Sequence, residues 1–298
     1  MNRPAEIEFA KLSAAGNRYV AVDARGLDLD WSAVSRQISH EELGVGSDGM
    51  VLITDCSDGT YRMCVMNSDG SEAEMSGNGL RLFAKFLIDS QLVEAAEREL
   101  LIETGAGPRT IWPTIEGNKM VSCRVNMGIP SFQPEDLPCT ADPGEMLALR
   151  IQLSRNTVEA TCLSVGNPHA VLILNRPVDD FALEEIGTEI QNHQLFPNRV
   201  NVEIVNVLSR SLIRPRIFER GEGETLSSGT GSTASAVACR IHRLIDEEVT
   251  VRCKGGDLTV RWPGEGDAFL GGPTTEVGAG VWSLERREAR WTRGGSDA

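Results

Sequence analysis

Two short stretches of the chain combine a serine with a glycine-rich turn, directly before a helix-like apolar pattern. "EMSGNGLRLF" places Ser76 ahead of Gly77–Gly79, and "LSSGTGSTAS" places Ser228 ahead of Gly229–Gly231. The first N–H groups of a helix have no partner within it, and together with the helix dipole they attract a carboxylate or phosphate. An ordinary serine N-cap explains either stretch alone, but the repetition favours two matched anion-binding half-sites. Neither stretch has the G-x-x-x-x-G-K-[ST] pattern of a nucleotide-binding P-loop.

The paired serines suggest a particular reaction. If both turns hold one α-carboxylate, Ser76 and Ser228 face opposite sides of the neighbouring carbon. One group then removes the α-proton and the other returns a proton from the opposite face. The two helix N-termini stabilise the charge that develops on the carboxylate as the carbanion forms. The pattern therefore indicates a two-base racemisation or epimerisation.

The repeat extends beyond the serines. "AAGNRYVAVD" at 14–23 corresponds to "SVGNPHAVLI" at 164–173, an offset of 150 positions, and the two serines are 152 apart. "ELLIETGAG" and "VTVRCKGGD" match at nearly the same offset. Three matches in one order predict two homologous α/β halves related by a pseudo-twofold axis. We expect an N-terminal half at 1–119, a C-terminal half at 120–275 and a segment at 276–298 that returns to the first half. The Pro- and Gly-containing stretch "TGAGPRTIWPTIEGNKM" contains the first boundary.

Short strand-like runs dominate the chain, and several alternate with period two and end in Gly, Asn or Asp. They are "EIEFAKL", "RYVAVDA", "GMVLITD", "YRMCVMN", "ELLIET", "KMVSCRVNM", "EATCLSV", "AVLILN" and "VNVEIVNV". Helices are expected at 31–43, behind an Asp30 cap, at 182–193, and after each serine motif. In the two segments that follow the serine motifs, apolar residues recur at helical spacing, namely Leu80, Phe83, Ala84 and Leu87 in the first and Ala234, Val237, Ala238 and Ile241 in the second. We predict an α+β fold in which each half is a curved, mostly antiparallel sheet around a central helix.

Composition limits the partners and cofactors. The net charge of −14 argues against a nucleic-acid partner, because phosphate contacts need clustered Lys and Arg. No apolar run is long enough to span a membrane and the N-terminus lacks a secretory signal, so we expect a cytoplasmic protein. Seven cysteines without any C-x-x-C spacing indicate reduced thiols rather than a zinc site or a disulfide framework. The four histidines lack ligand spacing and no lysine has a recognisable Schiff-base context. We therefore expect no metal, pyridoxal phosphate or nucleotide cofactor.

Longer motifs around the serines resemble a known family. "MNSDGSEAEMSGNGLRLFA" resembles the diaminopimelate epimerase motif Asn-x-Asp-Gly-Ser-x-Ala-x-x-Cys-Gly-Asn-Gly, and "FERGEGETLSSGTGSTASA" resembles Glu-Arg-Gly-x-Gly-Glu-Thr-x-x-Cys-Gly-Thr-Gly. "ETGAG", "VNMGIP", "VGNPHAV" and "FPNRVNVE" follow in the family's order, so the resemblance covers nearly the whole chain. It implies two α/β halves with the site in the cleft between them. It also implies cofactor-independent conversion of LL- to meso-diaminopimelate, in lysine and peptidoglycan precursor synthesis, by a homodimer.

The resemblance also implies roles for individual residues. The reacting carboxylate would be held by Gly77, Asn78, Gly229 and Thr230, and the amino-acid end that does not react by Asn67, Asn167, Asn201 and Arg220. The planar guanidinium of Arg220 suits a bidentate carboxylate clamp. Gly16-Asn17 and Gly49 match further substrate-binding positions. His169 and Glu219 match residues that flank the catalytic pair and tune it, and Glu219 also matches a substrate-binding position.

The chain departs from the family at the reacting groups themselves. Ser76 and Ser228 stand where both motifs have a catalytic cysteine, and a serine hydroxyl is a far weaker acid than a thiol. The family's Lys-Met-His-Gly-x-Gly-Asn-Asp-Phe is "KLSAAGNRY" here, so that Ser13 replaces a histidine and Arg18 an aspartate. An engineered Cys→Ser exchange accounts for the first two changes only, whereas natural divergence accounts for all four.

Three interpretations remain open from the sequence. The first is an epimerase that acts on diaminopimelate. The second is a catalytically impaired or Cys→Ser-substituted relative that binds diaminopimelate or a related amino acid without epimerising it. The third is a diverged isomerase that uses Glu219 or His169 as its base.

Overall fold

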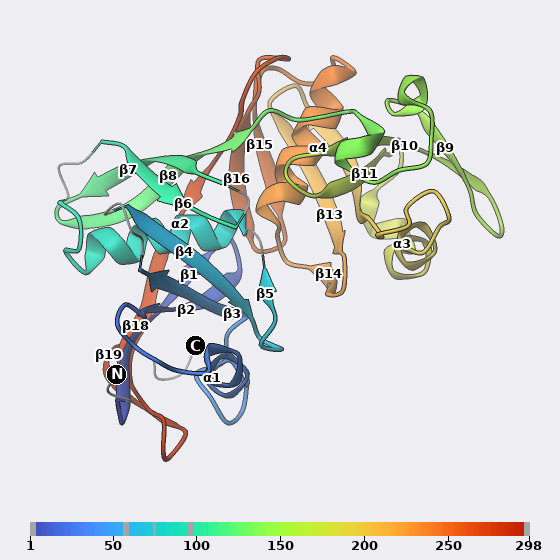
Figure 1. Cartoon of the computed structure of the whole chain (residues 1–298). Coiled ribbons are helices and arrows are strands. Elements are labelled where there is room, and N and C mark those ends of the chain that lie inside the picture. Colours follow the sequence, from blue (N-terminus) through green and yellow to red (C-terminus); the bar gives the residue numbers. More distant parts are fainter. Residues whose placement is uncertain (1–3, 56–59, 74–75, 95–97, 106, 295–298) are drawn as a thin grey trace. The chain divides into compact units, whose positions relative to one another are not determined.

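The computed structural model describes residues 4–55, 60–73, 76–94, 98–105 and 107–294. The chain divides into two compact units, Met1–Val125 with Gly272–Ala298 (unit 1) and Asn126–Gly271 (unit 2) (Figure 1). The two boundaries between these units, after Val125 and before Gly272, each differ by a few residues from the boundaries expected after 119 and 275. The stretch "TGAGPRTIWPTIEGNKM", expected to contain a boundary, lies within unit 1, where it forms strand β7 (Arg109–Glu116) and the turn into β8 (Lys119–Gly128).

Unit 1 is built on a mixed sheet. Its other strands are β1 (Glu6–Ala14), β2 (Asn17–Asp23), β3 (Gly49–Thr54), β4 (Tyr61–Asn67), β5 (Glu72–Ala73), β6 (Leu100–Glu103), β18 (Thr275–Ser283) and β19 (Glu288–Gly294). Strand β2 pairs parallel with β3, and β4 pairs parallel with β6. The pairs β1–β2, β3–β4, β4–β5, β6–β7 and β7–β8 are antiparallel. Strands β18 and β19 extend this sheet beside β1.

Unit 2 repeats this topology strand by strand. Its strands are β9 (Leu149–Gln152), β10 (Thr157–Ser164), β11 (Pro168–Ile173), β12 (Asn201–Ser209), β13 (Leu212–Glu219), β14 (Gly223–Thr225), β15 (Glu248–Cys253), β16 (Gly256–Arg261) and β17 (Ala268–Pro273). The parallel pairs are β11–β12 and β13–β15, and β10–β11, β12–β13, β13–β14, β15–β16 and β16–β17 are antiparallel. The same order of pairings from β1 and from β10 supports the duplication that the sequence motifs predict.

Each unit has one helix against which many strands pack. In unit 1 it is α2 (Gly77–Asp89), which contacts β1, β2, β3, β4 and β7, and in unit 2 it is α4 (Gly229–Ile241), which contacts β10, β11, β12, β13, β15 and β16. Every residue of α2 from Gly77 to Ile88 is buried, and so is every residue of α4 from Gly229 to Cys239. A helix that is enclosed on all sides in this way is a core element. The expected central helix is therefore present in both units.

The residue composition of α2 and α4 explains how both helices can be buried on all sides. Helix α4 consists largely of Gly, Ala, Ser and Thr, which let strands approach closely: a Cβ on Gly231 would lie 2.9 Å from Glu203 Oε1. Helix α2 instead buries two cations with partners. Lys85 Nζ donates to Met120 O at 2.6 Å and lies 2.8 Å from Asp89, and Arg81 donates to Pro273 O at 3.1 Å. Buried charges persist when hydrogen-bonded in this manner.

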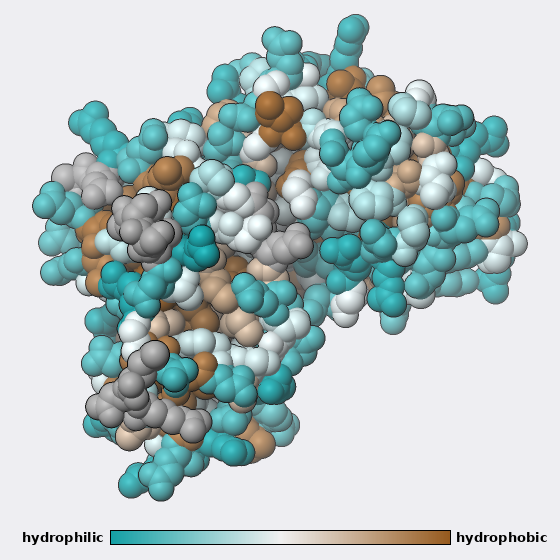
Figure 2. Space-filling view, in the orientation of Figure 1, coloured by the Kyte–Doolittle hydropathy of each residue, from teal (hydrophilic) through white to brown (hydrophobic). Residues whose placement is uncertain are grey.

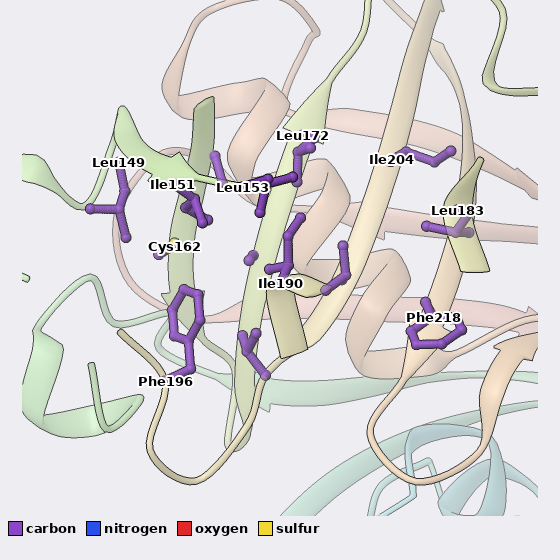
Figure 3. Packing of buried hydrophobic residues seen from close by; sticks show 14 of the residues in the cluster. Leu149, Ile151, Leu153, Cys162, Leu172, Leu183, Ile190, Phe196, Ile204 and Phe218 are labelled. Carbon is purple, nitrogen blue, oxygen red and sulfur yellow. The ribbon is translucent and has the colours of Figure 1, made fainter. Parts of the chain in front are cut away.

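The remaining helices lie on a different core. Helix α3 (Leu183–Gln191) packs on an apolar cluster from β9, β10, β11 and β12, whose side chains point toward one another in Figure 3. Because alternate strand residues face opposite sides, Val202 and Ile204 of β12 join this cluster while Glu203 faces α4. In unit 1 the corresponding cluster includes Val20 and Val22 of β2 and covers α1 (Trp31–Ile38).

Most predicted elements are present, and the exceptions have local causes. Asp30 caps α1 by accepting from Ala33 N at 3.0 Å, as expected, but the helix ends at Ile38 rather than at residue 43. His40 Nδ1 accepts from the N–H groups of Glu42 and Leu43 at 3.2 Å, which stabilises a turn there instead. The strand-like runs predicted from the sequence do not include β5, β7, β9 or β13–β19. Of these, β7 and β13 contain prolines, which argue against a strand.

The face in Figure 2 is mostly hydrophilic, with apolar side chains in small groups. None of the helices among the described residues is long and apolar enough to cross a membrane.

Candidate active site: two matched serine half-sites

In unit 1, Ser76 is the N-cap of α2. Its φ and ψ are −136° and 118°, and its Oγ accepts a hydrogen bond from Gly79 N at 3.0 Å. A second hydrogen bond reaches the same oxygen from strand β2, where the Tyr19 hydroxyl lies 3.4 Å away. Ser76 is partly exposed and Tyr19 is buried. The serine is therefore held by a helix terminus on one side and a phenol on the other.

A chain of side-chain hydrogen bonds adjoins Ser76. Arg81 donates to Asn78 Oδ1 at 2.6 Å, Asn78 Nδ2 donates to Asn17 Oδ1, and Asn17 Nδ2 donates to Asp48 Oδ2 at 3.1 Å. Arg18 N donates to the same Asp48 oxygen at 2.8 Å. A guanidinium only donates and a carboxylate only accepts, so the two ends of the chain fix the orientation of both amides. Sequence reasoning found Asn17 and Asn78 but missed Arg81 and Asp48.

In unit 2, Ser228 caps α4 with nearly the same geometry. Its φ and ψ are −141° and 132°, and its Oγ accepts from Gly231 N at 3.1 Å. Glu219 is the last residue of β13, and its carboxyl lies near enough to the Ser228 and Thr225 hydroxyls for both to lower its pKa. Burial raises the pKa of Glu219 above its usual value, and the Ser228 hydroxyl opposes that shift. A carboxylate of raised pKa beside a hydroxyl is the arrangement of a general base with its nucleophile or proton carrier.

His169 lies behind this half-site rather than against the serine. Its Nδ1 is 2.7 Å from Glu203 Oε1 and its Nε2 is 2.7 Å from Asn167 Oδ1, with both His169 and Glu203 fully buried. Asn167 Nδ2 donates to Thr230 Oγ1 at 3.3 Å, and Thr230 Oγ1 is 3.4 Å from Ser228 Oγ. Burial raises the pKa of Glu203, and His169 opposes the shift. His169 thus reaches Ser228 through two intervening side chains.

The two half-sites correspond residue by residue. Asn17 bonds to Asn78 in unit 1 as Asn167 bonds to Thr230 in unit 2. Tyr19 and His169 hold equivalent positions, two residues after those asparagines on β2 and β11. The sequence names His169 as a candidate and misses Tyr19, although the internal repeat aligns the two residues.

Two further candidates of unit 1 lie at the pairing of β3 with β4, where Gly49 is opposite Asn67. A Cβ on Gly49 would lie 2.2 Å from Met66 O, so the backbone contact itself requires glycine there. Asn67 Nδ2 donates to Ser71 Oγ at 2.9 Å in the turn that leads to Ser76. Asn67 is the counterpart of Glu219, because each is the last residue of its strand.

The remaining candidates of unit 2 form a pair beside Glu219. Asn201 Oδ1 accepts from Arg220 N at 2.8 Å, which ties the start of β12 to the end of β13. The Arg220 side chain is exposed, and its Nη1 donates to Asn198 O at 3.1 Å. An exposed guanidinium held in this way can take a carboxylate.

The described cysteines lie outside the two serine motifs. None of the six (Cys64, Cys123, Cys139, Cys162, Cys239 and Cys253) forms a disulfide, and Cys56 lies outside the described residues. Burial raises the pKa of Cys64, Cys123 and Cys239 to about 12, which leaves little thiolate at neutral pH. Across the part of the chain that the structure describes, no group of three or more His, Cys, Asp or Glu side chains is arranged to hold a metal ion.

Comparisons with known proteins agree with the fold and the motifs. The family model for diaminopimelate epimerase matches residues 9–133 and 161–277. Diaminopimelate epimerase of Agathobacter rectalis is 38% identical over 92% of this chain and 98% of its own length. That of Moorella thermoacetica is 36% identical over 94% and 100%.

Solved structures share the fold at low sequence identity. A hydroxyproline epimerase from Agrobacterium vitis with bound trans-4-hydroxy-L-proline superposes with a TM-score of 0.72 at 15% identity, covering 95% of this chain and 94% of that one. A methylitaconate-Δ-isomerase gives 0.62 at 14% identity, covering 95% and 96%. The length and identity of the sequence matches establish that the chain belongs to the diaminopimelate epimerase family.

Proposed function

We propose that this protein is a cofactor-independent amino-acid epimerase that inverts an α-carbon of diaminopimelate, converting the LL- to the meso-form. One observation supports the reaction type above the others: Ser76 and Ser228 cap two equivalent buried helices with the same geometry, 3.0 and 3.1 Å from the third N–H of each turn. Family membership supports the substrate.

The proposed roles follow from what each side chain can do. Ser76 and Ser228 carry protons to and from opposite faces of one α-carbon, and the N-termini of α2 and α4 with Gly77, Asn78, Gly229 and Thr230 receive the α-carboxylate. Asn17, Gly49, Asn67, Asn167, Asn201 and Arg220 hold the rest of the substrate. Glu219 accepts the Ser228 proton as Ser228 removes the α-proton. His169 is a positioning residue, since its contacts are with Glu203 and Asn167.

The test is exchange of the substrate α-hydrogen with solvent. Purified protein is incubated with LL- or meso-diaminopimelate in deuterated water, and deuterium at the α-carbon is followed by mass spectrometry and NMR. We expect exchange together with formation of the other stereoisomer. Ser76→Ala and Ser228→Ala should each abolish inversion, and Ser209→Ala, which removes an exposed serine at the end of β12, serves as the matched control. No exchange above background in the unsubstituted protein overturns the proposal.

A second function is favoured by the serines themselves. Because an alcohol is a much weaker acid than a thiol, the protein could hold the amino acid without inverting it. Titration calorimetry with meso-diaminopimelate distinguishes the two: binding without any exchange supports a ligand-binding relative. A third outcome, exchange of a different acid substrate, supports a diverged isomerase with Glu219 as its base, and the fold shared with a methylitaconate-Δ-isomerase makes unsaturated acids the first to try.

A further inference from the structure

We propose that Tyr19 is a catalytic residue: its phenol is the acid/base group that makes Ser76 competent, as Glu219 does for Ser228. This inference rests on the proposed function and assigns a residue that neither the sequence motifs nor the family resemblance singles out. It explains how serine can serve in the half-site of unit 1, where the counterpart of Glu219 is an asparagine.

In unit 1, two hydrogen bonds reach the Ser76 hydroxyl. Tyr19 Oη is 3.4 Å from Ser76 Oγ, and Gly79 N donates to the same oxygen from 3.0 Å. With Tyr19 and Gly79 N both donating, the Ser76 proton is directed to a third partner, which is the proton-giving state of this half-site. When Tyr19 is a phenolate, the hydrogen bond between the two runs from Ser76 to Tyr19. The Tyr19–Ser76 distance is long for an O–H···O bond, and catalytic hydrogen bonds of this kind shorten when substrate binds.

Unit 1 lacks a carboxylate at the position that Glu219 occupies in unit 2. Glu219 lies at the end of β13, beside Ser228. The equivalent end of β4 has Asn67, whose amide cannot act as a base at neutral pH and donates a hydrogen bond to Ser71. Tyr19 stands where the family motif has phenylalanine. Compared with the family motif, this chain therefore has an additional hydroxyl, that of Tyr19, beside the position where serine stands in place of the motif's cysteine.

A phenol is acidic enough to exchange a proton with Ser76. A tyrosine has an ordinary pKa of about 10, roughly 1.5 units above that of a thiol, whereas an alcohol is far weaker. In the deprotonation direction, the Tyr19 phenolate takes the Ser76 proton while Ser76 Oγ takes the α-proton, which leaves neutral tyrosine, neutral serine and the substrate carbanion. Reprotonation runs the same two transfers in reverse. Charge and protons balance, and Ser76 never persists as an alkoxide.

The chain offers a matched control, because it has two tyrosines. Tyr61 lies in the same unit and its hydroxyl donates to Leu92 O at 2.6 Å. Tyr19→Phe and Tyr61→Phe each remove one hydroxyl and keep the ring. We expect Tyr19→Phe to lower the rate of α-hydrogen exchange by about 10²-fold or more and Tyr61→Phe to leave it within about twofold. Circular dichroism and the melting temperature check that both variants are folded.

Two further readouts separate catalysis from structure. In a Ser76→Cys background the thiol is itself an adequate acid, so adding Tyr19→Phe should lower the rate by less than about 10-fold. The Tyr61→Phe variant also retains Tyr19 as its single tyrosine, so phenolate absorbance against pH reports this residue alone. We expect its midpoint to coincide with the limb of the pH–rate profile that Tyr19→Phe removes.

The outcomes distinguish this inference from the proposed function. An active protein in which Tyr19→Phe matches the unsubstituted rate overturns the role of Tyr19 and leaves the epimerase proposal standing. Equal losses from Tyr19→Phe in the serine and cysteine backgrounds also overturn it, since they indicate a packing effect. An inert serine protein that gains activity only with Ser76→Cys and Ser228→Cys overturns both the role of Tyr19 and activity of the serine form.

Discussion

His169 Nδ1 lies 2.7 Å from Glu203 Oε1, and neither side chain is exposed to solvent. The pair orients the imidazole so that Nε2 meets Asn167, which in turn meets Thr230 beside Ser228. A carboxylate that fixes a histidine in this way controls both its tautomer and its ring orientation. This hydrogen-bonded pair is thus the innermost support of the half-site in unit 2.

The first prediction concerns this pair. Glu203→Ala leaves His169 buried without its partner and is expected to lower the free energy of unfolding by about 3–5 kcal/mol in urea titrations. Glu203→Gln keeps the shape and a hydrogen-bonding oxygen, so its loss should be smaller. A double variant, Glu203→Ala with His169→Leu, should lose less than the sum of the single changes, because neither member of the pair is then buried without the other. Additive losses would contradict the coupling.

The second prediction separates the stability and activity effects of Glu219. Because burial raises its pKa above the usual 4.5, the folded protein favours the protonated form. The stabilisation from this group is therefore complete below pH 4.5 and is lost as pH rises through the raised pKa. Glu219→Gln cannot ionise, so we expect the variant to become progressively more stable than the unsubstituted protein above that pH.

The same substitution should lower α-hydrogen exchange by about 10²-fold, since the base at Ser228 is removed. Melting temperatures across pH 4–8 and exchange rates measured in parallel check both effects. Glu222→Gln, an exposed glutamate in the adjoining turn, is the control and should change neither. A variant that is less stable at neutral pH, or equally active, contradicts the assignment.

The third prediction concerns cysteine at the two serine positions. Ser76→Cys with Ser228→Cys should raise epimerisation by about 10²-fold or more, with little change in KM, because acidity and not shape is altered. Either change alone should help less, since each face of the carbon needs a competent group. A double variant that binds diaminopimelate and stays inert would instead point to Ser13, Arg18 or Gly49.

The fourth prediction tests the hydrogen-bonded chain that ends at Asp48. Asp48→Ala releases Asn17, whose amide can then rotate away from Asn78, and we expect KM for diaminopimelate to rise about 2- to 10-fold with kcat little changed. Asp48→Asn keeps an acceptor oxygen, held in place by Arg18 N, and should restore the original KM. Asp48 is exposed, so neither variant should disturb folding. Identical KM values in both variants would separate Asn17 from substrate binding.

Local sequence patterns were sufficient for much of the fold. Serine followed by Gly-x-Gly and an apolar helical repeat predicts the N-caps at Ser76 and Ser228, because capping depends on residues within one turn. Alternation predicts strands such as β2 and β11, because side chains of a strand alternate between two faces. The internal repeat predicts two units of equal topology, and the pairings from β1 and from β10 bear this out.

The partners of the serines were decided by tertiary structure. Tyr19 meets Ser76 across 57 positions, and Glu203 meets His169 across 34. Tyr19 lies on β2 and the other pair on β11 and β12, and the parallel registers of β2 with β3 and of β11 with β12 set where these residues lie in the sheet. Periodicity says that a residue faces inward but not which atom it meets there. Burial of Glu219, which raises its pKa, likewise depends on the enclosure of α4 by many strands. The sequence alone thus determined which residues could react, and the packing of strands on α2 and α4 decided which groups lie beside them.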